Sequence, residues 1–261
     1  MKKITLVLLF LVVSIAATAG TLQQKHSAVI ALKNVAVPAS CEPAGVDEYY
    51  DLEAASLPTG WAETDTATML DFQDSTDSKC SASNSMSIDI DSSADAFISY
   101  NMGEEKVTAS TGFWWKAPTI TAETMDLMIS GLGGGAYASA NVIVFFRKQA
   151  GPTYRLYLYG WAFSTNYYTV TSGNWYYVAY KNTEGAADGN SAGSMYLFDS
   201  NGDAVNHNGS AAELTLTGKD GGTQQYFSYG FYYTANDSGS NKMFIDDISI
   251  DTTGATHPLG P

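Results

Sequence analysis

The chain has 261 residues, with 27 acidic and 13 basic side chains and a formal net charge of −14. This charge excludes nucleic acids and anionic membrane surfaces as natural partners, because phosphate binding needs a cationic face. Hydrophobic residues make up 45% of the chain, which is enough to bury a core and excludes a disordered protein. With 24 glycines, 17 tyrosines and only 15% charged residues, the composition is typical of an all-β extracellular protein.

The first residues have the pattern of a targeting segment. Lys2 and Lys3 precede an apolar run over residues 4–17, and the small residues at 17–19 supply a signal-peptidase site. The run is shorter than the ~20 apolar residues that cross a bilayer. We therefore expect residues 1–19 to be a signal peptide. Its removal leaves an exported protein, extracellular, cell-surface or periplasmic, without a membrane span.

The remaining chain divides into a leader or linker, residues 20–44, and one domain, residues 45–261. Within the domain, short runs of β-branched and aromatic residues alternate with Gly, Pro, Asn and Asp clusters, and no stretch keeps a helical period. This pattern predicts an all-β fold, a single antiparallel β-sandwich of two sheets. In chain order, the predicted strands are residues 87–91, 96–101, 112–116, 142–148, 154–161, 175–181, 194–198, 225–234 and 242–250, with a glycine-rich turn at 131–135.

The two cysteines, Cys41 and Cys80, fit an oxidising compartment, where one intramolecular pairing is possible. Closing a loop of about 40 residues contributes roughly 4 kcal/mol of stability in the chain-entropy model. A zinc site needs more cysteine or histidine ligands than three scattered histidines supply. We therefore predict a Cys41–Cys80 disulfide.

Several motifs resemble those of the concanavalin A-like superfamily, whose laminin-G-like members are jelly rolls. Residues 56–61 read SLPTGW, which is similar to the opening of exported domains of this kind. Residues 171–178 read TSGNWYYV and are followed by a strand–turn–strand pattern over 195–202, as in laminin-G-like domains. Residues 244–250 read FIDDISI, which resembles the closing strand of such domains. The resemblance spans residues 45–261 and implies a lectin-like jelly roll, although this fold also hosts glycosidases and lyases.

The sequence lacks the motifs of the enzymes in this superfamily. Glucanases of this fold carry an E-x-D-x-x-E strand, which puts acid and base on one face. The nearest candidates, Asp89 and Asp91, lack the glutamates and are interpreted as a solvated strand face. Residues 226–232 resemble the Tyr-x-Lys-x-Gly-x-Tyr strand of alginate lyases, but Ser228 stands at the lysine position. We predict no catalytic residues and favour a protein that is not an enzyme.

The most informative strand is residues 154–161, whose alternation points Leu156 and Leu158 toward the core. The opposite face then carries Arg155, Tyr157, Tyr159 and Trp161. Aromatic planes stack on the apolar faces of sugar rings and a guanidinium donates to sugar hydroxyls, so this row predicts a carbohydrate-binding groove on the concave sheet. The alternative is that the rings pack under a neighbouring loop or form cross-strand pairs.

Three further tryptophans bear on the groove. Trp114 and Trp115 are adjacent, so a regular strand points them to opposite faces. We predict that Trp115 shares the carbohydrate-binding groove. The place of Trp175 in the resemblance is structural, so we assign it to the core.

The last predicted strand carries two adjacent carboxylates, Asp246 and Asp247. Strict alternation puts Asp246 on the apolar face of the strand, where an unpaired carboxylate is costly. In similar modules such a pair, with an acidic residue of the first strand, holds a structural Ca²⁺, and Asp51 and Glu53 match that position. The resemblance thus implies a calcium site formed by these four residues. The alternative is that Asp246 accepts backbone N–H bonds in a turn.

Three functional hypotheses follow. The first is an exported, non-catalytic module that binds a glycan on the concave sheet, with neutral polysaccharide favoured by the acidic net charge. The second is an extracellular structural or adhesion protein that self-associates, because residues 20–44 can add a strand to a neighbour. The third is a polysaccharide-cleaving enzyme of the same fold.

Overall fold

The computed structural model describes residues 42–65, 69–79, 84–90, 96–121, 126–133, 140–149, 153–160, 162–183, 191–219, 224–231 and 241–261. All of them belong to the unit Cys41–Pro261. The expected signal peptide, most of the leader, and both Cys41 and Cys80 lie outside the described residues, so export and the disulfide stay predictions. No helix within the described ranges is long and apolar enough to cross a membrane.

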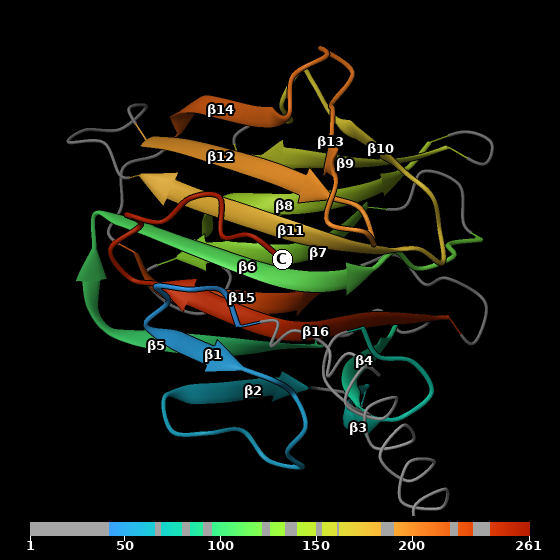
Figure 1. The fold of residues 1–261 in the computed structure, drawn as a ribbon, viewed down its shortest axis with the longest axis vertical. Coiled ribbons are helices and arrows are strands. Elements are labelled where there is room, and N and C mark those ends of the chain that lie inside the picture. Colours follow the sequence, from blue (N-terminus) through green and yellow to red (C-terminus); the bar gives the residue numbers. More distant parts are fainter. Residues whose placement is uncertain are drawn as a thin grey trace, which may run out of the picture. The chain divides into compact units, whose positions relative to one another are not determined.

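The described strands form two antiparallel sheets, which we call sheet A and sheet B (Figure 1). Sheet A runs in the order β13 (Ala204–Val205), β12 (Ser191–Phe198), β11 (Trp175–Thr183), β6 (Thr108–Lys116), β16 (Lys242–Asp251), β4 (Ser85–Asp89) and β3 (Leu70–Asp74). In addition, β1 (Glu48–Tyr50) pairs with β16, and β14 (Glu213–Lys219) pairs with β12. Sheet B runs in the order β10 (Tyr168–Val170), β9 (Tyr154–Tyr159), β8 (Ala140–Lys148), β7 (Asp126–Gly133), β15 (Gln224–Phe231), β5 (Ala96–Lys106) and β2 (Trp61–Asp65).

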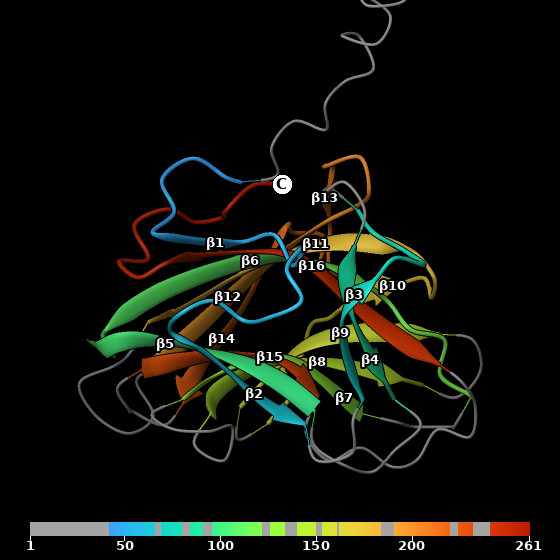
Figure 2. The same cartoon turned by 90° about the horizontal axis from the view of Figure 1, so that it is seen from below.

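The two sheets lie face to face, and one apolar core fills the space between them (Figure 2). Regular strands contribute alternate residues to this core, as Val178 and Tyr180 of β11 and Leu156 and Leu158 of β9 do. Side chains of the intervening positions lie on the outer faces. The predicted all-β sandwich of two antiparallel sheets is therefore confirmed.

Each strand predicted within the domain corresponds to an observed strand. The observed strands that were not predicted are β1, β2, β3, β7, β10, β13 and β14, of which β7 lies in the interior of sheet B. One connection was wrongly predicted. The glycine-rich turn expected at residues 131–135 begins as strand, because β7 extends to Gly133. Gly131 lies opposite Ser228 of β15 and Ile143 of β8, so partners on both sides hold a segment that has little intrinsic β-propensity.

Candidate functional site

The row of residues predicted to bind sugar lies on β9, and the strand alternates as expected. Leu156 and Leu158 are fully buried in the core. Arg155 and Tyr159 lie on the outer face of sheet B and are partly exposed, whereas Tyr157 on the same face is only 7% exposed. Another part of the chain must therefore cover the middle of the row.

The segment that follows β9 folds back over this outer face. The Ser164 N–H donates to the Leu158 carbonyl at 2.7 Å, and the Leu158 N–H donates to the Ser164 hydroxyl at 3.2 Å. The ring centroid of Phe163 then lies 4.8 Å from that of Tyr159 and 5.3 Å from that of Tyr157. Packing under a neighbouring segment, the alternative considered from sequence, thus explains why Tyr157 is buried.

Two arginines complete the surface. The strands β8 and β9 pair so that Arg147 lies directly opposite Arg155. The guanidinium carbon of Arg147 lies 3.9 Å from the ring centroid of Phe163, and that of Arg155 lies 4.0 Å from the ring centroid of Tyr167. Both distances are those of cation–π contacts. The arginine–aromatic surface, as we call it, is the set Phe145, Arg147, Arg155, Tyr157, Tyr159, Phe163 and Tyr167.

Sequence reasoning missed four members of this surface. Phe145 and Arg147 carry a usable signal, since they alternate on β8 with buried core residues in the same way as the row on β9. Phe163 and Tyr167 lie in irregular backbone, where no periodicity indicates the direction of a side chain.

The prediction that Trp115 shares this surface is wrong. Trp115 is fully buried between the sheets, with its ring centroid 5.1 Å from that of Phe146 and 6.3 Å from that of Tyr176. The reason is that β6 belongs to sheet A, so neither of its faces is the outer face of sheet B. Trp161, the last residue of the predicted row, lies outside the described residues, and its role stays a prediction.

A second aromatic cluster lies on the outer face of sheet A. It buries Trp114, Trp175 and Tyr177, with 5.4 Å between the ring centroids of Trp114 and Tyr177. The Trp175 Nε1–H donates to Asp77 Oδ1 at 2.9 Å, and the Lys79 ammonium lies 4.8 Å from the Trp114 ring centroid. Trp175 is therefore buried, but in this outer cluster and not in the core to which we assigned it.

The acidic pair near the C-terminus departs from strict alternation. Between Asp246 and Ser249, β16 carries one residue more than the paired part of β6, which is a β-bulge. Asp247 adopts a left-handed backbone there, with φ of 47°. Because Ile245 and Ile248 both lie in the core, Asp246 and Asp247 both lie on the outer face of sheet A. This corrects the prediction that Asp246 shares the apolar face.

Both carboxylates are fully buried, and the protein supplies their hydrogen-bond donors. The backbone N–H of Lys79 donates to Asp246 Oδ2 at 2.8 Å, and that of Asp247 donates to Asp246 Oδ1 at 3.1 Å. The Tyr49 hydroxyl donates to Asp247 Oδ1. Burial, followed by the hydrogen bond and charge of Asp247, raises the pKa of Tyr49, so this hydroxyl stays protonated. Asp246 thus accepts backbone N–H bonds, as its alternative interpretation proposed.

The other two predicted calcium ligands also bind protein donors. Glu53 accepts the backbone N–H of Asn84 at 3.1 Å and its side-chain amide at 3.0 Å. Asp51 is exposed and accepts the Glu53 N–H at 3.2 Å. In the part of the chain that the structure describes, no three His, Cys, Asp or Glu side chains converge as a metal site. Calcium binding by Asp246, Asp247, Asp51 and Glu53 therefore stays a prediction. The described residues do not bring these four side chains together as a ligand set.

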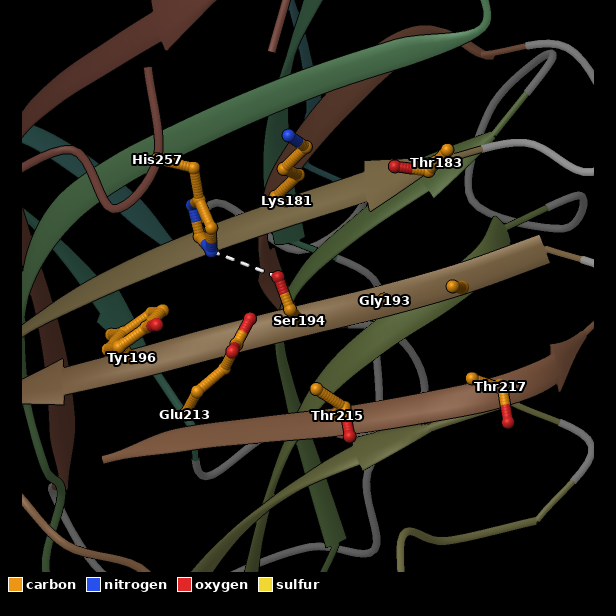
Figure 3. A pocket seen from close by; sticks show the side chains of 10 residues that line it. Lys181, Thr183, Gly193, Ser194, Tyr196, Glu213, Thr215, Thr217 and His257 are labelled. Carbon is orange, nitrogen blue, oxygen red and sulfur yellow. Dashed lines mark hydrogen bonds between the residues drawn. The ribbon is translucent and has the colours of Figure 1, made fainter. Parts of the chain in front are cut away.

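The outer face of sheet A also carries a groove that no sequence motif indicated (Figure 3). It has a volume of about 470 Å³ and lies over β11, β12 and β14, bounded by the C-terminal segment. In register, Ser194 lies between Lys181 and Thr215, so neighbouring strands bring their polar side chains together. The polar lining residues are Lys181, Thr183, Ser194, Tyr196, Glu213, Thr215, Thr217 and His257.

The groove contains a serine–histidine pair, since His257 Nε2 lies 3.0 Å from the Ser194 hydroxyl. A nucleophile and its base also need a group that orients the other ring nitrogen. His257 Nδ1 is buried and has no hydrogen-bond partner among the described residues. Burial, and secondly the charge of Lys181, lowers the pKa of His257 to about 4. The neutral imidazole therefore anchors the C-terminal segment to β12, and no group in the described part of the chain orients its other ring nitrogen as a catalytic triad requires.

No protein-family model and no curated protein matches the chain. Among solved structures, a Crh5 transglycosylase is 13% identical, with 84% of this chain and 88% of that chain covered and a TM-score of 0.48. The β-glucanase of Bacillus licheniformis is 11% identical, with 80% and 99% covered and a TM-score of 0.47. The alginate lyase Aly36B, solved with an alginate trisaccharide, is 9% identical, with 64% and 81% covered and a TM-score of 0.47. Similarities at such identities say nothing about the ligand of this chain.

Proposed function

We propose that this chain is an exported carbohydrate-binding protein and that its arginine–aromatic surface stacks against sugar rings. One observation carries the proposal. The partly exposed rings of Phe145, Tyr159 and Phe163 form a cluster with centroids 4.8 to 5.7 Å apart, beside two guanidinium groups. Such rings offer apolar planes to the C–H faces of a sugar, while guanidinium groups donate to its oxygens.

The chemistry of this surface favours binding over bond cleavage. Its members, as defined above, are rings and guanidinium groups, whereas glycoside hydrolysis uses two carboxyl groups about 5–10 Å apart. The groove of Figure 3 fits a sugar less well, because Tyr196 is the one large aromatic ring among the described residues that line it, and Ser194 already bonds to His257. The surface on sheet B is therefore the better binding site.

Affinity electrophoresis through gels that contain neutral or acidic polysaccharides tests this proposal, followed by calorimetry on any hit. We expect the secreted protein to be retarded by at least one glycan. Tyr159→Ala should weaken that binding about fivefold, because a stacked aromatic contributes on the order of 1 kcal/mol. The matched control is Phe198→Ala, which removes a partly exposed ring from the outer face of sheet A.

Two results would overturn the proposal. One is a folded wild-type protein that no glycan retards. The other is an equal loss of affinity in Tyr159→Ala and Phe198→Ala, which would move the binding site away from sheet B. Circular dichroism spectra and melting temperatures of the three proteins establish that each is folded.

A further inference from the structure

The arginine–aromatic surface carries a charge arrangement that stacking on sugar rings does not use. Across β7, β8, β9 and β10, backbone register puts Asp126, Arg147, Arg155 and Thr169 in one row. Like charges directly opposite each other on neighbouring strands are destabilising. The row holds two arginines and one aspartate, and the neighbours of Arg155 in it are a cation and an uncharged residue.

Ring stacking holds Arg155 in place without using its hydrogen-bond donors. The guanidinium carbon lies 4.0 Å from the centroid of the Tyr167 ring, and a cation–π contact of this kind occupies none of the five N–H donors. Tyr167 is fixed in turn, because its N–H donates to Asn208 Oδ1 at 2.8 Å and its carbonyl accepts the Asn208 N–H at 3.0 Å. The position of the cation is therefore set before any ligand arrives.

Arg155 makes few polar interactions with the described part of the chain. Its Nη1 donates to the Tyr157 hydroxyl at 3.3 Å, and its buried Nε has no hydrogen-bond partner among the residues that the structure describes. The ion pairs among the described residues belong to other side chains, so no described carboxylate neutralises Arg155. The side chain is nevertheless partly exposed, which leaves this positive charge accessible at the surface.

We propose that this surface selects a glycan that carries an oxyanion, a carboxylate or a sulfate ester, and that Arg155 binds the oxyanion while nearby rings stack on the sugar. This inference rests on the proposed function. A guanidinium binds such a group through two parallel N–H···O bonds, which a neutral hydroxyl does not accept. Arg147 lies directly opposite Arg155 on the neighbouring strand.

The acidic net charge, which predicted a neutral glycan, does not outweigh this local arrangement. Salt screens exposed charges beyond about 8–10 Å, so most of the negative charges of the protein act weakly at this surface. A charge-assisted hydrogen bond at contact is not screened in that way. Arg155 therefore decides the sign of the ligand, and the net charge mainly slows its approach.

Polymers that share one backbone isolate the contribution of the charge. The probes are dextran, carboxymethyl-dextran and dextran sulfate, together with polygalacturonate and its methyl ester as a second backbone. We expect the secreted protein to bind a charged polymer at least about tenfold more tightly than its neutral counterpart, the effect of one charge-assisted hydrogen bond. Arg155→Gln should remove most of this preference. Arg155→Lys, which keeps the charge and loses the planar donor edge, should restore only part of it.

The matched control is Lys106→Gln, which removes one positive charge from β5 and should leave the preference unchanged. Melting temperatures establish that each variant is folded. A preference for carboxylate over sulfate, or the reverse, supports the proposal and identifies the oxyanion.

Three results would overturn it. Equal affinity for charged and neutral polymers, with both weakened by Tyr159→Ala, would remove the charge selection and leave sugar binding in place. An equal effect of Lys106→Gln and Arg155→Gln would show a nonspecific charge effect. Failure of the folded wild type to bind any polymer would overturn this inference and the proposed function together.

Discussion

The outer faces of the two sheets hold charged side chains in opposite ways. On sheet A, the carboxylates of Asp246, Asp247 and Asp251 are at most 2% exposed, and backbone N–H groups and hydroxyls of the protein bond to them. On sheet B, Arg155 is partly exposed, lies over a ring, and makes one long hydrogen bond within the described ranges, to a tyrosine hydroxyl. Protein donors satisfy the hydrogen-bonding capacity of these carboxylates, whereas the described residues leave that of the Arg155 guanidinium largely unused.

This difference separates charge that stabilises the fold from charge that a ligand can use. A carboxylate that leaves water loses free energy unless protein donors replace the water. Asp251 shows such a replacement, since it accepts the N–H groups of Thr253 at 2.8 Å, Gly254 at 3.1 Å and Thr256 at 2.8 Å. Burial alone raises the pKa of Asp251, but these bonds and the Thr253 hydroxyl outweigh it and lower the pKa. A group satisfied in this way gains nothing from a ligand.

The largest expected effect comes from removing one of these carboxylates. Asp251→Ala should lower the free energy of unfolding by about 3 kcal/mol, because three buried or partly buried N–H groups lose their acceptor where the C-terminal segment leaves β16. Urea denaturation at pH 7 measures this loss.

A matched variant tests whether burial is the cause. Asp199 lies in the exposed turn after β12, where its Oδ1 accepts the N–H groups of Asn201 at 2.8 Å and Asp203 at 3.1 Å. Asp199→Ala should cost less than about 1 kcal/mol, because water can take over these bonds. Equal losses in Asp251→Ala and Asp199→Ala would break the link between burial and structural role.

A smaller, pH-dependent effect on the free energy of unfolding comes from His257, which also anchors the C-terminal segment. The pKa of His257 falls from its ordinary 6.5 to about 4 in the folded protein, so between these pH values the unfolded chain binds a proton that the folded chain does not. The contribution of His257 to stability is therefore fully present above pH 6.5 and is lost as the pH falls to 4. Full linkage would amount to about 3 kcal/mol, which the partial exposure of the ring reduces to about 1–2 kcal/mol.

Urea denaturation of the wild type and of His257→Gln at pH 7 and at pH 4.5 measures this contribution. The wild type should lose more stability than the variant over this interval, while the carboxylates common to both cancel in the comparison. Parallel losses would contradict the assignment of His257 as a neutral anchor.

Strand alternation predicted the faces of β9 and failed on β16, and the two strands show why. A regular strand has only two faces, so the buried Leu156 and Leu158 determine where Arg155 lies. In β16, one extra residue moves every later side chain to the other face. The sequence around Asp246 contains no signal that predicts this bulge. Prediction from sequence is therefore reliable for strands without insertions and unreliable at irregularities.

The second limit is the assignment of strands to sheets. The two faces of β6 followed from its sequence, but its neighbours β11 and β16 are distant in the chain, and only their pairing puts Trp115 in sheet A. The same limit hid the surface on sheet B, where Phe163 and Tyr167 reach the arginines from irregular backbone. Long-range pairing and irregular backbone thus account for the parts of the candidate site that the sequence did not predict.

The smallest effect on stability is expected at Arg155, and it is the sharpest test of the comparison between the two faces. Arg155→Gln should change the free energy of unfolding by less than about 1 kcal/mol, because a partly exposed cation–π contact contributes little and its loss also relieves the repulsion from Arg147. Urea denaturation of this variant, in the buffer used for Asp251→Ala, measures the change. A loss as large as that of Asp251→Ala would place Arg155 among the structural charges. A negligible loss, together with weaker binding of an acidic glycan, would show that the fold holds Arg155 for a ligand, because its charge then contributes to binding and not to folding.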